Sequence, residues 1–140
     1  MLNTALWIVQ TFVAVVFVLA GATKLSLPRE RLAKRMHWAE AWPRGRIRML
    51  GLAEVAGAVG LVVPAATGIA PVLTPIAAAC LCVLMVGAVR THRQLGEGFV
   101  PAAVIGALCV AIAVGRVATS HAANGPAVVV PSAAQAGQPR

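Results

Sequence analysis

The chain has 140 residues, of which 59% are hydrophobic and only 11% charged, and its mean hydropathy is +0.84. A soluble domain is about half apolar and about a quarter charged, so this composition excludes an ordinary water-exposed surface. The formal charge is +8, but the basic residues lie in the segments between apolar runs, which favours membrane orientation over nucleic-acid binding as their role. We therefore expect an all-α polytopic membrane protein with no nucleic acid among its partners.

Four apolar runs are long enough to be membrane spans. We predict transmembrane helices at about residues 4–22, 47–63, 72–89 and 99–115, packed as an up-down-up-down four-helix bundle. At a rise of about 1.5 Å per residue, the second and fourth are short for a hydrocarbon core of about 30 Å, so we expect them to rely on tilt or on flanking turns. The first run ends in small residues that resemble a signal-peptidase site. No basic residue precedes that run, so we predict that it is retained.

Two segments lie outside the predicted spans. Residues 29–42 follow Pro28, carry apolar and basic side chains on different faces, and place Trp38 and Trp42 near their end. We predict a short helix that lies in the membrane interface, with an irregular solvated loop as the alternative. Residues 119–140 are rich in small and polar residues without periodicity, which predicts a disordered tail after a membrane domain of residues 1–118.

The basic residues are distributed unevenly between the two sides of the predicted bundle. The first and third connections, with their flanks, hold 10 of the 12 Lys and Arg residues, and the opposite side holds 2. Because loops rich in Lys and Arg stay in the cytoplasm, this count predicts a plasma-membrane protein whose two termini are both extracytoplasmic.

Small and polar side chains gather on one face of each predicted span. Small residues let membrane helices approach closely, and bulky aliphatic residues face lipid without penalty, so we expect these faces to point inward. The predicted inward faces carry Gln10, Ala14, Phe17, Gly21 and Lys24 in the first span; Gly51, Glu54, Gly57, Ala58 and Leu61 in the second; Thr74, Ala78, Met85, Ala88 and His92 in the third; and Ala102, Gly106, Cys109, Ala113 and Arg116 in the fourth.

Glu54 is the only acid within the four predicted spans. A carboxylate there costs about 2.5–3.5 kcal/mol on insertion scales, which makes it a functional candidate. Lys24 ends the first span on the same side, and His92 follows the third, so the three residues form a candidate polar pocket that would bind a headgroup or relay protons. Two alternatives stay open: a structural Lys24–Glu54 ion pair that fixes helix register, and an interfacial His92 that serves only topology.

The remaining reactive side chains form no complete catalytic or metal-ligating pattern. Cys80, Cys82 and Cys109 lie in apolar runs without CxxC or zinc-ligand spacing, so we predict no metal site and interpret them as small hydrophobic residues. An approach of Cys80 to Cys109 between helices is the redox alternative. We expect His37 and His121 to be solvated, so a bis-His haem is not expected, and no dinucleotide-binding glycine motif is present.

Three motifs occur in a characteristic chain order. They are GATKL at residues 21–25, GLAEVAGAVGLVVP at residues 51–64, and the run of residues 73–92 that begins LTPIAA and ends at a histidine. Together they resemble the DoxX and DoxX-like membrane protein family, in its Gly-x-x-Lys at the end of the first helix, its second helix, and its third helix with the exit from it. The resemblance covers about residues 4–118.

The resemblance implies a four-helix integral membrane protein that works beside oxidoreductases. Some relatives are subunits of thiosulfate:quinone oxidoreductase, and others associate with enzymes of thiol and oxidative-stress defence. Lys24 and Glu54 are the only pocket positions carried over. The implied cofactor is a quinone, and the candidate partners are membrane lipids, an oxidoreductase and a second copy of the chain. Whether the chain has catalytic activity of its own is left open, and the alternatives are a small-solute or lipid binder or carrier and a non-catalytic scaffold.

Overall fold

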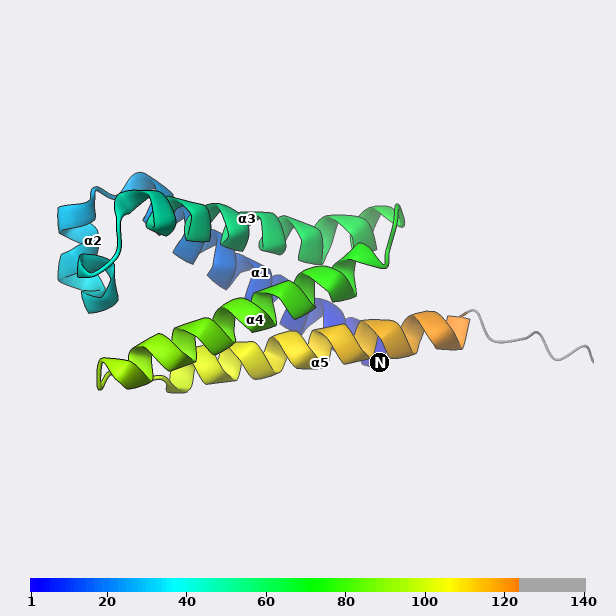
Figure 1. Ribbon diagram of the computed structural model, residues 1–140. Helices are drawn as coiled ribbons and strands as arrows, with labels where there is room; N and C mark the ends of the chain where they lie inside the picture. Colours follow the sequence, from blue (N-terminus) through cyan, green and yellow to red (C-terminus); the bar gives the residue numbers. More distant parts are fainter. Residues whose placement is uncertain (124–140) are drawn as a thin grey trace, which may run out of the picture.

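The computed structural model describes residues 1–123. Within them the chain is entirely helical, which confirms the predicted fold class (Figure 1). Four long helices are each long and apolar enough to cross a membrane, and a short helix with a 3₁₀ turn lies between the first two. The elements are α1 (Leu2–Ser26), α2 (Arg29–Arg35), η1 (His37–Glu40), α3 (Arg44–Thr67), α4 (Leu73–Gln94) and α5 (Val100–Ala123).

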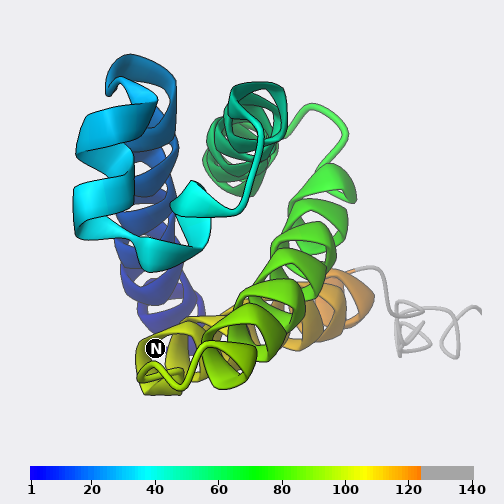
Figure 2. The same cartoon turned by 60° about the vertical axis from the view of Figure 1, so that its left-hand side comes forward.

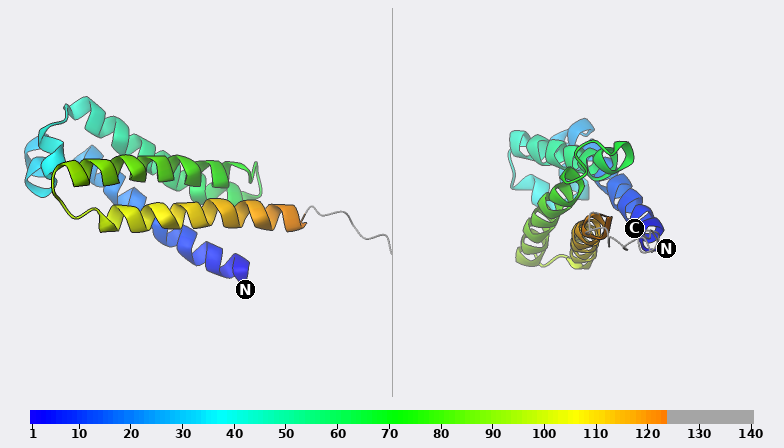
Figure 3. Two further views of the ribbon diagram at one scale, coloured as in Figure 1. Left: turned by 60° about the horizontal axis from the view of Figure 1, so that its bottom comes forward. Right: turned by 90° about the vertical axis from the view of Figure 1, so that its right-hand side faces the viewer.

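Each long helix packs on the next one along the chain, and α5 returns to pack on α1 (Figures 1 and 3). One end of the bundle carries α2, η1 and the α4–α5 connection, and we call it the α2 end. The other end carries the N-terminus and the α3–α4 connection, and we call it the N-terminal end. Helix α2 lies crosswise to the long helices in the view of Figure 1, and Figure 2 shows α2 and η1 in front of the ends of α1 and α3.

The second and fourth spans are longer than the apolar runs predicted. Helix α3 starts at Arg44 and continues through Pro64 to Thr67, so it has 24 residues, as does α5. The flanking turns that we expected to supplement these short apolar runs are present, because residues outside each apolar window continue the helix. Helix α5 also includes residues 119–123, the first part of the predicted disordered tail, and the rest of that tail lies outside the described residues.

The predicted interfacial helix of residues 29–42 is not continuous. Helix α2 ends at Arg35, Met36 adopts an extended conformation (φ −137°, ψ 97°), and η1 follows as a single 3₁₀ turn. The bend at Met36 lets both pieces contribute to one small core, in which Leu32 of α2 and Ala39 of η1 pack with Ile47 of α3. Tertiary packing therefore overrides the helical periodicity of this segment.

The main core lies between the four long helices and is made largely of the predicted inward faces. Its fully buried members come from all four spans, and the opposite faces leave aliphatic side chains exposed, as expected for helices surrounded by lipid. The main core consists of Val13, Ala14, Phe17, Ala58, Leu61, Ala78, Leu81, Cys109 and Ile112.

Candidate functional site

A buried ion pair joins α1 to α3 near the α2 end. The Lys24 Nζ donates hydrogen bonds to both carboxylate oxygens of Glu54, at 2.8 Å to Oε1 and 2.7 Å to Oε2. The two side chains are only 6% and 4% exposed. Both carboxylate oxygens accept a hydrogen bond from the same ammonium group, so most of the hydrogen-bonding groups of the pair have partners without water. A charged pair in a low-dielectric interior needs such partners. Chemically it is an acid and a base in direct contact, so it can hold and exchange a proton.

The pair forms because two glycines let the helix backbones approach. A Cβ added to Gly21 would lie 2.7 Å from the carbonyl oxygen of Gly51, and one added to Gly51 would lie 2.9 Å from the carbonyl oxygen of Gly21. Each glycine stands three residues before a member of the pair, and therefore on nearly the same helix face. The small residues thus set the separation at which Lys24 reaches Glu54.

The segment between α1 and α3 covers the pair. Lys24 Nζ lies 5.9 Å from the ring centroid of Trp38, within the range of a cation–π contact. The Trp38 ring in turn packs edge to face on Trp42, with ring centroids 5.8 Å apart. Arg44, at the start of α3, donates to the Leu27 carbonyl just beyond α1. These contacts hold the α1–α3 connection over the ion pair.

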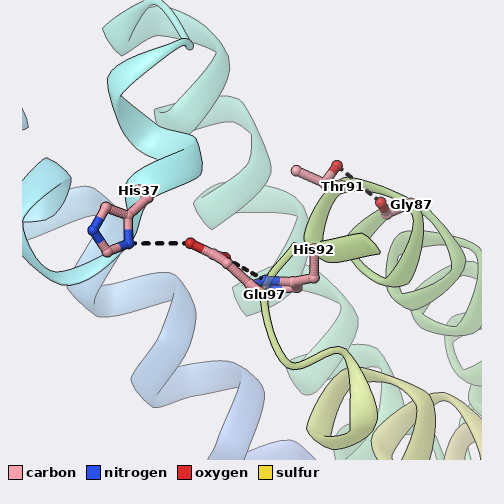
Figure 4. A network of polar contacts seen from close by, with 5 residues as sticks. All are labelled: His37, Gly87, Thr91, His92 and Glu97. Carbon is pink, nitrogen blue, oxygen red and sulfur yellow. Dashed lines mark hydrogen bonds and ion pairs between the residues drawn. The ribbon is translucent and has the colours of Figure 1, made fainter. Parts of the chain in front are cut away.

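His92 lies elsewhere, in a polar bridge between η1 and the α4–α5 connection (Figure 4). Its Nδ1 is 2.8 Å from Glu97 Oε2, and His37 Nδ1 is 3.1 Å from Glu97 Oε1. The structure therefore brings together Lys24 and Glu54 but pairs His92 with Glu97 instead. His37 is exposed, as expected for a solvated residue, yet it is also one arm of this bridge.

A glycine turn positions Glu97. Gly96 has a φ of +68°, and its N–H donates to the Arg93 carbonyl at 3.3 Å while the Glu97 N–H donates to the His92 carbonyl at 2.9 Å. This pair of bonds is the Schellman motif, which needs a left-handed residue after the helix. The motif turns the chain back on α4, so the Glu97 carboxylate meets the imidazole of His92.

A second polar cluster, centred on the buried Gln10, lies toward the N-terminal end. Gln10, which is fully buried, donates through Nε2 to the Leu61 carbonyl at 2.7 Å and accepts at Oε1 from Arg116 Nε at 2.8 Å. Arg116 also donates to Asn3 Oδ1 at 3.0 Å, and its guanidinium lies 4.7 Å from the centroid of the Trp7 ring. One amide side chain therefore links α1, α3 and α5.

The roles of Gln10, Arg116 and Glu97 were not predicted, although each residue has a signal in the sequence. Gln10 is an uncharged polar residue inside an apolar run, where it needs hydrogen-bond partners. Arg116 follows an apolar run on the predicted inward face. Glu97 comes directly after Gly96, and a glycine after a helix indicates a turn back onto its last residues.

The cysteines are all free thiols, but their arrangement differs from the alternative raised by the sequence. Cys80 is exposed, whereas Cys82 packs against the core cluster that contains the buried Cys109. The approach of Cys80 to Cys109 is therefore not observed, because the face of α4 that meets α5 carries Cys82. Among residues 1–123, no group of three or more His, Cys, Asp and Glu side chains converges as a metal site.

Comparison with known proteins adds one match. A model of the DoxX-like family matches residues 8–115, which span all four long helices and include both members of the ion pair. No curated protein and no solved structure matches the chain. Because the family model covers more than half of the sequence, this four-helix membrane protein belongs to the DoxX-like family.

Proposed function

We propose that this protein is a membrane subunit of a redox system, in which a partner oxidoreductase completes the chemistry in contact with a quinone. The observation that carries the proposal is the buried Lys24–Glu54 pair, with Lys24 Nζ 2.7 and 2.8 Å from the two carboxylate oxygens. Ionisable residues inside a membrane are expensive and are functional candidates by default. Quinone reduction consumes protons as well as electrons, and a buried acid–base pair is a group that can supply a proton while the partner supplies the electrons.

The position of the pair supports this role. It lies near the α2 end, where Trp38 covers it. We propose that this end faces the cytoplasm, because it carries every Lys and Arg of the described residues except Arg116. A cytoplasmic partner would then dock beside the pair, and protons would reach it from the cytoplasmic side.

The test is native purification of the tagged full chain in mild detergent, with mass spectrometry of co-purifying quinones and proteins. The variant is Lys24→Met with Glu54→Gln, which removes both charges together. The matched control is Lys34→Met with Glu30→Gln, the same two substitutions on exposed residues of α2. We expect the wild type and the control to retain a quinone and an oxidoreductase, and the pair variant to lose most of the quinone.

Two outcomes would contradict the proposal. A wild-type protein that is folded and monodisperse but carries neither a quinone nor an oxidoreductase would show that it is not part of a redox complex. Retention of an oxidoreductase by all three proteins, with no quinone in any of them, would instead favour a scaffold in which the ion pair is structural.

A further inference from the structure

An apolar groove lies between α4 and α5, and the proposed redox role does not explain it. It encloses about 280 Å³ and is bounded by aliphatic and small side chains of both helices. Val86 and Val110 on its walls are 65% and 48% exposed, so the groove opens on the outer face of the bundle. Its lining residues on α4 are Cys82, Met85, Val86 and Val89. Those on α5 are Ala102, Ala103, Gly106, Ala107 and Val110.

A second, open hollow adjoins the groove at the α2 end of α4. It has a volume of about 500 Å³ and is lined by α4 residues alone, namely Val86, Val89, Arg90, Arg93 and Gln94. Val86 and Val89 line both hollows, so the two lie next to each other along α4. From Arg93 back to Cys82, the α4 side of the combined surface extends roughly 16 Å at the rise of an α-helix. That is about the depth of one leaflet of a hydrocarbon core about 30 Å thick.

The combined surface is polar and positive at one end only. Arg90 is exposed, and the Arg93 guanidinium lies 5.6 Å from the centroid of the Phe99 ring, which keeps it beside the end of the bundle. The nearest acid in the sequence, Glu97, is engaged by His92 and His37. Within the described part of the chain, neither arginine forms an ion pair with a carboxylate. Two uncompensated guanidinium groups therefore stand at the mouth of an apolar groove.

The geometry points to a binding site for an anionic phospholipid. One acyl chain lies in the groove between α4 and α5, and the phosphate of the headgroup accepts hydrogen bonds from Arg90 and Arg93. Basic pockets between membrane helices are the sites at which anionic headgroups bind, and arginine matches phosphate oxygens with paired donors. The site is independent of the Lys24–Glu54 pair, which lies between α1 and α3.

The test compares phosphatidylglycerol with phosphatidylcholine of the same acyl chains, added to delipidated protein and counted by native mass spectrometry. The charge variant is Arg90→Ala with Arg93→Ala. Its matched control is Arg31→Ala with Arg35→Ala, which removes the same charge from exposed positions of α2. A third variant, Ala103→Phe, fills the groove and keeps both arginines, and Ala56→Phe places the same side chain on the exposed face of α3.

We expect the wild type to bind phosphatidylglycerol in preference to phosphatidylcholine with a stoichiometry of about one. A basic residue near an anionic lipid surface contributes about fivefold in affinity, so loss of both arginines should weaken phosphatidylglycerol binding about thirtyfold and abolish the preference. Ala103→Phe should weaken both lipids, because it removes the space for the acyl chain. The two control variants should behave as the wild type does.

Equal losses in the Arg90/Arg93 and Arg31/Arg35 variants would mean that binding depends on diffuse charge, and the proposed site would be wrong. Full binding by Ala103→Phe would exclude the groove as the place of the acyl chain. A wild-type dimer that Ala103→Phe separates, without a retained lipid, would show that the groove is an interface between copies and would overturn the proposal. Because no readout involves quinone or an oxidoreductase, these results do not depend on the redox role.

Discussion

Lys24 and Glu54 are 30 residues apart in the sequence, and the ammonium of one lies 2.7 and 2.8 Å from the two carboxylate oxygens of the other. The contact ties the end of α1 to the first half of α3 at the point where Gly21 and Gly51 bring the backbones together. The variant that lacks both charges distinguishes two roles. A structural pair predicts a stable double variant that keeps its quinone and partner, and a functional pair predicts a stable double variant that loses its quinone.

Removing one charge of the pair should destabilise the protein more than removing both. Lys24→Met or Glu54→Gln alone leaves an uncompensated buried charge, which costs about 3–5 kcal/mol in a soluble core, although couplings between membrane helices average about 0.6 kcal/mol. We expect each single variant to lower the unfolding midpoint in detergent, and the double variant to recover much of the loss. Additive losses in this double-mutant cycle would show that the two residues do not interact.

Gly21→Ala should separate α1 from α3. Its new Cβ would lie 2.7 Å from the Gly51 carbonyl oxygen, and a backbone atom cannot move aside without shifting a helix. Overpacking of this kind costs about 1–3 kcal/mol, so we expect a lower unfolding midpoint in detergent. Gly87→Ala is the control, because nothing lies within 4 Å of its Cβ and alanine is the better helix former. Equal midpoints for the Gly21 variant and the wild type would contradict the close packing.

Gly96→Ala should weaken the turn that joins α4 to α5. Gly96 has a φ of +68°, and an L-residue in the left-handed region costs about 1–2 kcal/mol. We expect a corresponding loss of stability in chemical unfolding, together with faster hydrogen exchange at the Glu97 amide, which donates to the His92 carbonyl. Gly98→Ala is the matched control, since its φ is not positive and its Cβ would meet nothing. If both variants behave alike, the Schellman turn contributes no stability.

The sequence predicted the inward faces well because one physical rule governs them. Small and polar residues at helical spacing must face other helices in a membrane, and Gln10, Gly21, Lys24, Gly51 and Glu54 are all buried. An apolar run, however, predicts only the part of a helix that lies in the hydrocarbon core. Helices α3 and α5 therefore extend past the predicted spans.

Contacts that depend on turns or on reach across the bundle could not be predicted in the same way. The bend at Met36 follows from packing on Ile47, and the position of Glu97 follows from a turn of two residues. The contact between Gln10 and Arg116 joins residues 106 positions apart. To predict this contact, one needs the relative depths of α1 and α5 in the membrane, and the spacing of residues along a single helix gives no information about them.

Gln10→Leu should destabilise the N-terminal end of the bundle. It removes the acceptor for Arg116 Nε and the side-chain donor to the Leu61 carbonyl of α3. Hydrogen bonds to charged groups contribute about 1.5–3 kcal/mol, and an unsatisfied buried group costs a similar amount. We expect a lower unfolding midpoint, which Arg116→Leu in the same chain should partly restore. Failure of the second substitution to restore stability would show that the pair is not coupled.

Cysteine labelling should determine the orientation of the bundle. A variant with alanine at Cys80, Cys82 and Cys109 should fold, because all three are free thiols and only Cys109 is buried. In that background we introduce a single cysteine either at Lys34 in α2 or at Ile69, which is 74% exposed in the α3–α4 connection. Since basic connections stay in the cytoplasm, a membrane-impermeant maleimide added to intact cells should label the Ile69→Cys variant at once and the Lys34→Cys variant only after lysis. The cysteine-free protein should remain unlabelled throughout, and the reversed order of labelling would place the α2 end outside the cell.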